Sequence, residues 1–340
     1  MLLRSNVSLK AFNTFGISVK ARYFLEISSA REARDFILSN RYSDVPYLVL
    51  GGGSNVLFST DYHGLILHNK ILGIEKESES DTEVWVKAGA GETWQTFVEY
   101  CLDRNWGGVE NLSLIPGSVG AAPIQNIGAY GVELKDVFHS LDALDMQTGT
   151  MNTFTAAQCR FGYRDSSFKK EWKGRFLITA VTLRLQKSPK VNISYGNVAE
   201  QLAAENILNP GIRDLSRVIC RIRRSKLPDP DRIGNAGSFF KNPFIPRDTF
   251  EELKDQWPNI SHYLQEDGSV KVPAAWLIDQ CGWKGKRFGQ YGVHENQPLV
   301  LVNYGGATGA DIVKLSEEIM VSVSDEFGID LEREVNIIQS

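Results

Sequence analysis

The sequence predicts an α+β protein of two or three domains, and three observations support this prediction. The chain has 340 residues, of which 42% are hydrophobic and 23% charged; these are globular values, and the chain is long enough to bury a large core. Short apolar runs that end in glycine alternate with amphipathic helical patterns. The segment 226–230, Lys-Leu-Pro-Asp-Pro, interrupts that alternation and is typical of a domain junction.

The N-terminal part of the chain alternates strands and helices. Ser29 and Glu32 form a capping-box pair, which predicts the start of a helix. Residues 47–50 form a short apolar run that leads into three glycines, as a buried strand entering a turn does. After a strand at 84–86, apolar side chains at three- and four-residue spacing predict a helix over 94–102.

The C-terminal part is also α+β. A helix over 215–222 is apolar on one face and basic on the other, and it should end before Pro228. Thr308 and Asp311 form a second capping-box pair, which predicts the start of the last helix. Alternation of apolar and polar residues over 331–338 predicts a final strand.

Composition and missing motifs exclude several function classes. The net charge of −4 argues against a nucleic-acid binder that relies on a general positive field. No apolar stretch suits a signal peptide or a membrane span, and the four cysteines make no CxxC pair. The GxGxxG, P-loop, HExxH and GxSxG motifs are absent. We therefore expect a cytoplasmic protein with free thiols and no metal, and, since no heptad pattern is visible, a monomer.

Two uncharged glycine-rich loops are candidates for binding a cofactor. Residues 51–55, Gly-Gly-Gly-Ser-Asn, directly follow the predicted strand, and residues 116–122 form a second loop of small side chains. Glycine lets the backbone approach a ligand closely and lets successive N–H groups converge on a phosphate. Either loop alone is equally consistent with a plain tight turn. Together, and without a Rossmann motif, they favour a dinucleotide held by a different fold.

Three polar residues stand out, and each also has a simple structural interpretation. Arg164 lies in a block with a second arginine around an aromatic residue, which suits a carboxylate or phosphate, or a surface ion pair with Asp165. Ser238 precedes two phenylalanines. Its hydroxyl could lie at the edge of an apolar pocket, or it could simply cap a turn. No histidine is close in sequence, so a hydrolase-type nucleophile is not supported. Glu334 alone fits a solvated strand residue.

Motifs along nearly the whole chain point to one family. The matching segments, in the family's order, are NTFGI at Asn13, GGGSNVLF at Gly51, IPGSVGAAPIQNIGAYGVE at Ile115, CRFGYRDSSFK at Cys159, KLPDP at Lys226 and GNAGSFFKNP at Gly234. The chain resembles the UDP-N-acetylenolpyruvoylglucosamine reductase (MurB) family, in the subgroup that carries a Tyr-bearing loop. The resemblance implies a two-part FAD-binding module of the vanillyl-alcohol-oxidase type, formed by 1–70 and 71–226 and completed by 328–340. A third, substrate-binding α+β domain would span 227–327.

The resemblance also implies an activity. In this family NADPH reduces a non-covalently bound FAD, which then reduces UDP-N-acetylglucosamine enolpyruvate to UDP-N-acetylmuramate, a precursor of peptidoglycan. An FAD-dependent oxidase of the same fold is an alternative, because a fold does not fix the chemistry. A non-catalytic sensor of flavin or sugar nucleotide is another. The sensor predicts loss of Arg164, Ser238 or Glu334, and all three are present.

By this resemblance, each candidate residue receives a role. Arg164 and Glu334 would lie at the substrate carboxylate, and Ser238 would donate a proton. The substrate-binding residues would be Tyr163, Tyr195, Lys226, Asn242 and Gln297. The cofactor-binding residues would be Gly51, Gly52, Gly53, Ser54, Asn55, Pro116, Gly117, Ser118, Gly120, Ala121, Gln125, Asn126 and Gly128. Arg333 stands next to Glu334, where many family members have proline, and we expect it to affect the strand and the field at Glu334.

Overall fold

A computed structural model describes residues 2–339 and divides them into two compact units. Unit 1 consists of residues 2–7, Ala21–Gly52 and His63–Arg223; unit 2 consists of Ser8–Lys20, Gly53–Tyr62 and residues 224–339. Both units mix helices and strands, which confirms the α+β prediction. The expected division into three domains stays a prediction.

The first sheet of unit 1 has four strands. In pairing order they are β1 (Arg4–Ser8), β2 (Lys20–Ile27), β5 (Tyr62–Asn69) and β3 (Tyr47–Leu50). The predicted strand at 47–50 is therefore confirmed, and it runs parallel to β5. The predicted helix start is confirmed at α1 (Ala30–Leu38), since the hydroxyl of its N-cap residue Ser29 accepts from the Glu32 N–H. The Glu32 carboxylate accepts from the Ser28 N–H and not from the Ser29 N–H, so the reciprocal bond of the predicted capping box is not formed.

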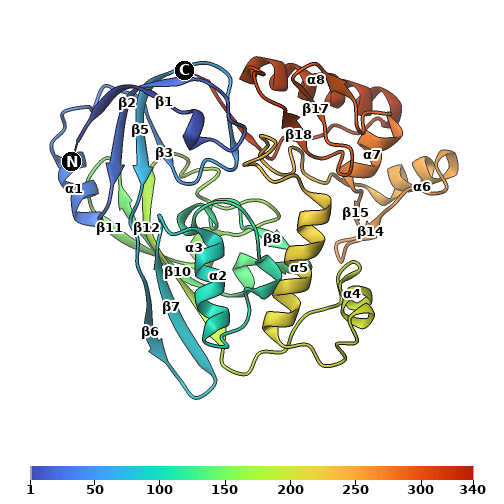
Figure 1. Cartoon of the computed structure of the whole chain (residues 1–340), viewed down its shortest axis with the longest axis horizontal. Coiled ribbons are helices and arrows are strands. Elements are labelled where there is room, and N and C mark those ends of the chain that lie inside the picture. Colours follow the sequence, from blue (N-terminus) through green and yellow to red (C-terminus); the bar gives the residue numbers. More distant parts are fainter. Residues whose placement is uncertain (1, 340) are drawn as a thin grey trace. The chain divides into compact units, whose positions relative to one another are not determined.

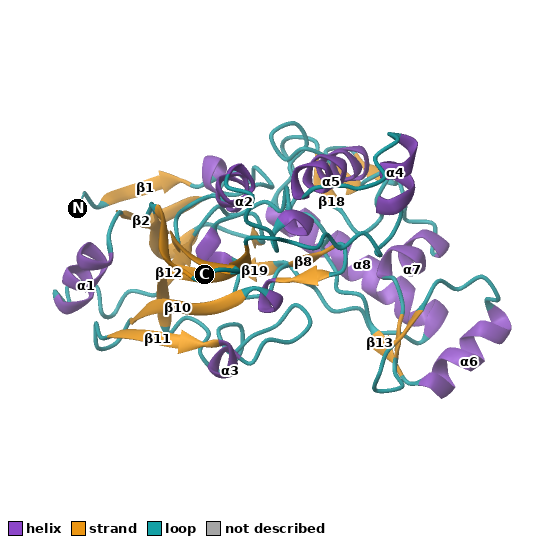
Figure 2. Cartoon of the chain, turned by 90° about the horizontal axis from the view of Figure 1, so that it is seen from below, coloured by secondary structure: helices purple, strands orange, loops and turns teal. Residues whose placement is uncertain are grey.

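The second sheet of unit 1 has five antiparallel strands. In pairing order they are β11 (Met151–Thr155), β10 (Phe138–Asp145), β12 (Phe176–Gln186), β7 (Glu83–Gly89) and β6 (Ile74–Glu79). Figure 2 shows β12, β10 and β11 side by side. The predicted helix is α2 (Trp94–Asp103), and its Trp94 and Phe97 are buried in the same core as Val84 and Val86 of β7. Burial of this apolar stripe explains why the helix forms here.

Unit 1 has further helices and one strand pair besides the two sheets. They are the helices α3 (Ala156–Cys159), α4 (Val198–Ala204) and α5 (Ile212–Lys226), short 3-10 helices at Glu110–Leu112, Val119–Ala121 and Leu134–Asp136, and the paired strands β8 (Gly128–Ala129) and β9 (Val132–Glu133). Helix α5 ends at Lys226, before Pro228, as predicted. The boundary between the two units falls within the last turn of α5.

The described residues of unit 2 form three small sheets, three α-helices and a short 3-10 helix at Lys10–Phe12. Its sheets pair β4 (Val56–Phe58) with β19 (Asn336–Ile338), β13 (Phe244–Ile245) with β15 (Val270–Lys271) and β14 (Tyr263–Leu264), and β16 (Arg287–Phe288) with β17 (Tyr291–Val293) and β18 (Leu301–Asn303). Its helices are α6 (Arg247–Gln256), α7 (Ala274–Gln280) and α8 (Gly309–Phe327). Helix α8 packs with α7, β17 and β18 (Figure 1). It begins with the predicted Thr308–Asp311 capping box and ends at Gly328.

The C-terminal strand is shorter than predicted. The alternation over 331–338 is present, but the strand β19 spans only Asn336–Ile338 and runs parallel to β4. The preceding residues pair with a different partner, because Arg333 bridges Phe240 instead. The expectation of one continuous strand was therefore wrong, since its two halves bind different segments.

Within residues 2–339, no helix combines the length and the apolar character needed to cross a membrane.

Candidate functional site

The two predicted glycine loops meet in unit 1. A methyl group added to Gly51 would lie 2.2 Å from the Ser118 hydroxyl oxygen, and one added to Gly52 would lie 3.2 Å from the Gly117 Cα. At Gly51 the neighbour is the end of a serine side chain, which would have to rotate away to admit a methyl group. At Gly52 the neighbour is the backbone of Gly117, so here the backbones of the two loops approach each other closely and glycine is favoured.

The second loop is fixed to the start of α2. The Val119 N–H donates to the Glu92 carbonyl at 2.8 Å, and the Trp94 N–H donates to the Gly117 carbonyl at 2.9 Å. Gly120 lies against Ala90, where an added methyl group would come within 2.5 Å of the Ala90 Cβ. These contacts give the loop one backbone conformation before any ligand binds.

The third glycine of the first loop, Gly53, belongs to unit 2. Its φ of +64° lies in the left-handed region that favours glycine. A methyl group there would lie 2.0 Å from the Phe12 carbonyl oxygen. The Gly53 carbonyl also accepts from the Thr14 N–H at 3.1 Å. Both the dihedral angle and the space therefore require glycine at this position.

These loops fit a dinucleotide cofactor. They carry no charged side chain, and Gly52, Pro116 and Ala121 are exposed while Ser118 and Gly120 are buried. Among their main-chain N–H groups, those of Val119, Gly120 and Ala121 bond within the protein. The candidates for a phosphate are therefore the N–H groups of the other glycines and serines of the loops. The predicted Ser54, Asn55, Gln125 and Gly128 are half-buried beside these positions in sequence.

Arg164 is held in a constrained conformation in unit 1. Its φ of +53° is unusual for a residue with a side chain. Its Nη2 donates to the Gly128 carbonyl at 2.7 Å, and its guanidinium lies 5.3 Å from the centre of the Tyr163 ring. The backbones of Gly162 and Asp165 bond each other at 3.0 and 3.3 Å and so close the turn. The structure thus brings together three residues to which the sequence analysis gave separate roles, Tyr163, Arg164 and Gly128.

Asn126 connects the second glycine loop to this turn. It is fully buried, and its Nδ2 donates to the Glu133 carboxylate at 3.1 Å and to the Gly162 carbonyl at 3.0 Å. Its Oδ1 accepts from the Lys135 N–H at 3.0 Å. The amide is thus fully used within the protein, which makes Asn126 an internal support of the loop.

Arg223 is a neighbour of Arg164 that the sequence analysis did not identify. Its Nε donates to the Leu114 carbonyl at 3.3 Å, immediately before the second loop. Burial lowers the pKa of Arg223, and the positive charge of Arg164 lowers it further. Among the described residues, no carboxylate pairs with Arg223. The one feature of the sequence that could have pointed to Arg223 is its position on the basic face of the helix that ends at Lys226.

Tyr195 lies in an exposed loop of unit 1. Its ring packs edge-on against Tyr130, with centroids 6.3 Å apart, and 46% of the residue is exposed. Burial raises the pKa of Tyr130, whereas the charge of Arg223 lowers it. Asn111 fixes the base of this region by donating to the carbonyls of Tyr130 and Asn192, both at 2.9 Å.

Ser238 occupies a sharp turn in unit 2. The preceding Gly237 has a φ of +69°, and its N–H donates to the Asn235 side chain at 2.9 Å. The following Phe239 N–H donates to the Leu299 carbonyl at 2.7 Å. Within residues 2–339, no group forms a hydrogen bond with the Ser238 hydroxyl. The turn is therefore held by its neighbours, and the cap role considered for Ser238 is filled by Asn235.

Glu334 is attached to the Ser238 turn through the backbone. Its N–H donates to the Phe239 carbonyl at 2.8 Å. Its carbonyl accepts from the Asn55 side-chain amide at 3.3 Å. Asn55 also accepts through its own carbonyl from the Asn336 N–H at 3.1 Å. Within unit 2, the structure therefore brings together the segments that carry Ser238, Glu334 and Asn55.

The remaining predicted residues of unit 2 differ in how many hydrogen bonds or ion pairs their side chains form within the protein. Lys226 is exposed at the end of α5 and forms no ion pair with any residue in 2–339. The Asn242 Oδ1 accepts from the Ala274 N–H at 2.9 Å, at the start of α7. The Gln297 Oε1 accepts from the Leu299 N–H at 3.4 Å. Asn242 and Gln297 thus keep their side-chain amide N–H groups for a ligand.

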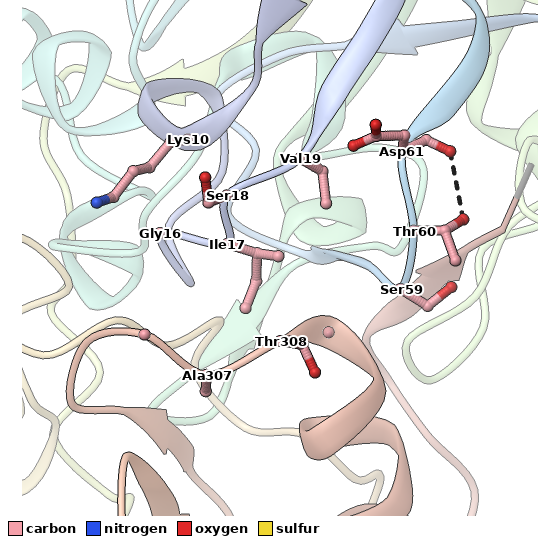
Figure 3. Close-up of a pocket in the computed structure, with 12 residues that line it drawn as sticks. Lys10, Gly16, Ile17, Ser18, Val19, Ser59, Thr60, Asp61, Ala307 and Thr308 are labelled. Carbon is pink, nitrogen blue, oxygen red and sulfur yellow. Dashed lines mark hydrogen bonds between the residues drawn. The ribbon is translucent and has the colours of Figure 1, made fainter.

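A separate cavity of about 310 Å³ lies in unit 2 (Figure 3). Its lining includes Lys10, Ser18, Thr60 and Asp61 and the start of α8 at Thr308. None of the predicted site residues lines it. In the described part of the chain, no cluster of three or more His, Cys, Asp or Glu residues is placed to hold a metal ion.

Comparisons with known proteins show which family and fold the chain resembles. The family model for the FAD-binding domain matches residues 21–155, and that for the UDP-N-acetylenolpyruvoylglucosamine reductase C-terminal domain matches 229–338. The chain is 49% identical to UDP-N-acetylenolpyruvoylglucosamine reductase of Flavobacterium johnsoniae, over 99% of this chain and 100% of that protein. It is 51% identical to the protein of that name from Pseudomonas aeruginosa, over 98% of both. The crystal structure of MurB from Thermus caldophilus has the same fold, with a TM-score of 0.69 at 24% identity, over 99% of this chain and 100% of that chain.

Proposed function

The chain belongs to the UDP-N-acetylenolpyruvoylglucosamine reductase family, and we propose that Arg164, Ser238 and Glu334 carry out the family's reaction in it. It is an FAD-dependent oxidoreductase that uses NADPH to reduce the enolpyruvyl group of its UDP-sugar substrate, giving UDP-N-acetylmuramate for peptidoglycan synthesis. The single observation that best supports the residue assignment is the Ser238 hydroxyl, which has no hydrogen-bond partner within residues 2–339 and is half-buried beside two phenylalanines.

The glycine loops would hold the cofactor. Gly51 and Gly52, together with Gly117 and Ser118, would present backbone N–H groups to the FAD pyrophosphate. Gly53 and Asn55 are further candidates for binding FAD. Bound FAD supplies hydride chemistry, with NADPH as the source of the hydride. The contribution of this chain is to hold these loops in one conformation, which lowers the conformational cost of binding.

Arg164 would stabilise the charge that develops during reduction. Addition of hydride to the terminal carbon of the enolpyruvyl group moves negative charge onto the substrate carboxylate. A guanidinium binds a carboxylate through two parallel N–H groups, so it can stabilise this charge where it forms. The hydrogen bond to Gly128 and the Tyr163 ring fix the direction of the Arg164 fork. Glu334 would act at the same carboxylate.

Ser238 would complete the reaction by protonation. The carbon next to the carboxylate must gain a proton to give the lactyl ether. A serine hydroxyl is a weak acid, but an enolate-like carbon is a strong base, and a positioned donor can make this transfer. The flanking hydrogen bonds of Gly237 and Phe239 hold the Ser238 backbone, so its hydroxyl remains available.

Lys226, Tyr195, Asn242 and Gln297 would bind the phosphates and polar groups of the two substrates. Lys226 is the strongest candidate for a phosphate because its ammonium group is exposed and forms no ion pair with a described residue. Since NADPH and the UDP-sugar both carry a diphosphate, one cation can serve both. We further propose a monomer in the cytoplasm, where NADPH and UDP-sugars are found and where the thiols of its four cysteines persist.

One experiment tests the proposed function as a whole. The purified protein should show the yellow absorbance of FAD, lose it on anaerobic addition of NADPH and regain it on addition of UDP-N-acetylenolpyruvoylglucosamine. Acid precipitation should release the flavin into the supernatant, because the binding is non-covalent. A flavin that NADPH bleaches but that only oxygen restores would instead indicate an oxidase.

A further inference from the structure

Arg333 makes specific contacts with α8 that the proposed reaction does not yet use. Its Nε donates to the Ser316 hydroxyl at 3.0 Å, and its Nη2 lies 3.3 Å from the Glu317 carboxylate. The Ser316 side chain is fully buried, and its hydroxyl in turn donates to the Val313 carbonyl at 2.6 Å. A planar guanidinium held at two points on one helix has little rotational freedom.

The backbone around Arg333 is held separately. The Lys241 N–H donates to the Glu332 carbonyl at 2.9 Å, and the Glu334 N–H donates to the Phe239 carbonyl at 2.8 Å. These two bonds flank the Arg333–Phe240 bridge. The backbone pairing of this segment is therefore made by the residues on either side of Arg333 and not by Arg333 itself. Side chains of successive residues in an extended segment point to opposite sides. The contact of Arg333 with α8 therefore places the Glu334 side chain on the other side.

Helix α8 is a rigid support for this contact. It is 19 residues long, carries a capping box at Thr308 and ends in a left-handed glycine at Gly328. Ser316 lies in its middle, on its buried face. An anchor to the middle of a capped and packed helix can fix the twist of the short segment 332–334.

We propose that Arg333 is a positioning residue, which sets the direction of the Glu334 carboxylate by anchoring segment 332–334 to α8. This inference rests on the proposed role of Glu334. The anchor acts through geometry and not through the charge of Arg333, because that charge already faces Glu317 on the far side of the segment. Misplacement of a reacting group by about 1 Å can cost on the order of 100-fold in rate, so a side chain outside the reaction can matter this much.

The test compares variants of the complete, FAD-loaded protein in the two half-reactions. We expect Arg333→Ala to slow flavin reoxidation by UDP-N-acetylenolpyruvoylglucosamine by roughly 10- to 100-fold. Flavin reduction by NADPH, flavin content and the calorimetric dissociation constant of the UDP-sugar should stay unchanged. Arg333→Lys should not restore the rate, since lysine keeps the charge but lacks the fork. Ser316→Ala should slow the same step, and adding it to Arg333→Ala should cause no further loss.

The matched control is Lys314→Ala on the same helix, where the lysine is 74% exposed and lies 4.0 Å from Glu318; it should leave both half-reactions unchanged. Recovery of the rate in Arg333→Lys, or an equal loss in both half-reactions for Arg333→Ala, would overturn the proposal. Glu334→Gln separates the two hypotheses. If it slows reoxidation while Arg333→Ala does not, the anchor is wrong and the role of Glu334 stands; if Glu334→Gln has no effect, the proposed role of Glu334 itself fails.

Discussion

The two regions that carry the proposed catalytic residues are stabilised in different ways. In unit 1, side chains hold the Arg164 turn: Asn126 is fully buried and bonds the Gly162 carbonyl, and Arg164 itself bonds Gly128. In unit 2, a backbone hydrogen bond from Glu334 to Phe239 joins the segments of Ser238 and Glu334, and side-chain bonds from Asn235 and Asn55 support them, while the Ser238 hydroxyl has no partner among residues 2–339. Substitutions should therefore affect stability in the first region and chemistry alone at Ser238.

The largest effect should come from Ser238→Ala, which removes a hydroxyl without removing a structural bond. Loss of a general acid typically costs 10²–10⁴-fold, so flavin reoxidation by the enolpyruvyl substrate should slow by about that factor. Reduction by NADPH and the free energy of unfolding should stay unchanged. Stopped-flow measurement of each half-reaction separates the two steps. Equal losses in both would mean that Ser238 has a structural role after all.

The substitution Gly53→Ala should have the next largest effect. It tests whether the backbone geometry of Gly53 supports the loop in unit 2. The left-handed conformation costs a residue with a Cβ about 1–2 kcal/mol, and the added methyl group would also lie 2.0 Å from the Phe12 carbonyl. We expect a loss of several kcal/mol in stability and protein purified with little flavin.

The control for this substitution is Gly52→Ala. Gly52 is exposed, and its added methyl group would meet Gly117 only at 3.2 Å. Its stability loss should be clearly smaller, as measured by thermal unfolding and by flavin absorbance per protein. Similar losses of stability and flavin in both variants would show that the left-handed conformation and close packing of Gly53 are not what the loop depends on.

The same comparison shows how far the sequence could lead. Local patterns predicted the helices that are capped by Ser29 and Thr308, because a helix N-cap is encoded within four residues. The final strand was only partly predictable, since alternation does not say that Arg333 pairs with Phe240 while Asn336 pairs with Val56. Such pairings depend on residues far apart in the chain, which a single sequence does not report.

The candidate site shows the same limit. Family motifs identified Arg164 and Gly128, and the structure brings these two together. They did not reveal that the Asn126 amide is fully occupied inside the protein, nor that Arg223 lies near Arg164. Both facts depend on which side chains meet after folding. Burial and hydrogen-bond partners are therefore what separate a supporting residue from one available to a ligand.

Asn126→Ala should show the dependence of unit 1 on side-chain bonds. It would leave the Lys135 N–H without its partner and the Gly162 carbonyl with the Asp165 N–H alone, at a cost of about 0.5–1.5 kcal/mol for each lost hydrogen bond. We expect a lower free energy of unfolding in urea and slower flavin reoxidation, since the Arg164 turn loses a support. Asn296→Ala, at an exposed position, is the control and should change neither quantity. Unchanged stability in Asn126→Ala would show that the turn is held by its backbone, as in unit 2.

Lys226→Ala should have the smallest effect, and it should be confined to binding. The lysine is exposed at the end of α5 and forms no ion pair with a residue in 2–339, so stability should not change. A charge-assisted contact with a phosphate contributes about 1.5–3 kcal/mol, which corresponds to roughly 10- to 150-fold in affinity. If the same ammonium group binds both diphosphates, the dissociation constants of NADP⁺ and of the UDP-sugar should rise together, as titration calorimetry can measure.

The control for a general loss of positive charge is Arg224→Ala, because Arg224 is a neighbouring and also exposed cation. If the binding of one ligand alone is weakened, Lys226 serves a single substrate. If Arg224→Ala weakens binding equally, the effect comes from the general positive charge of this region and not from a specific contact of Lys226.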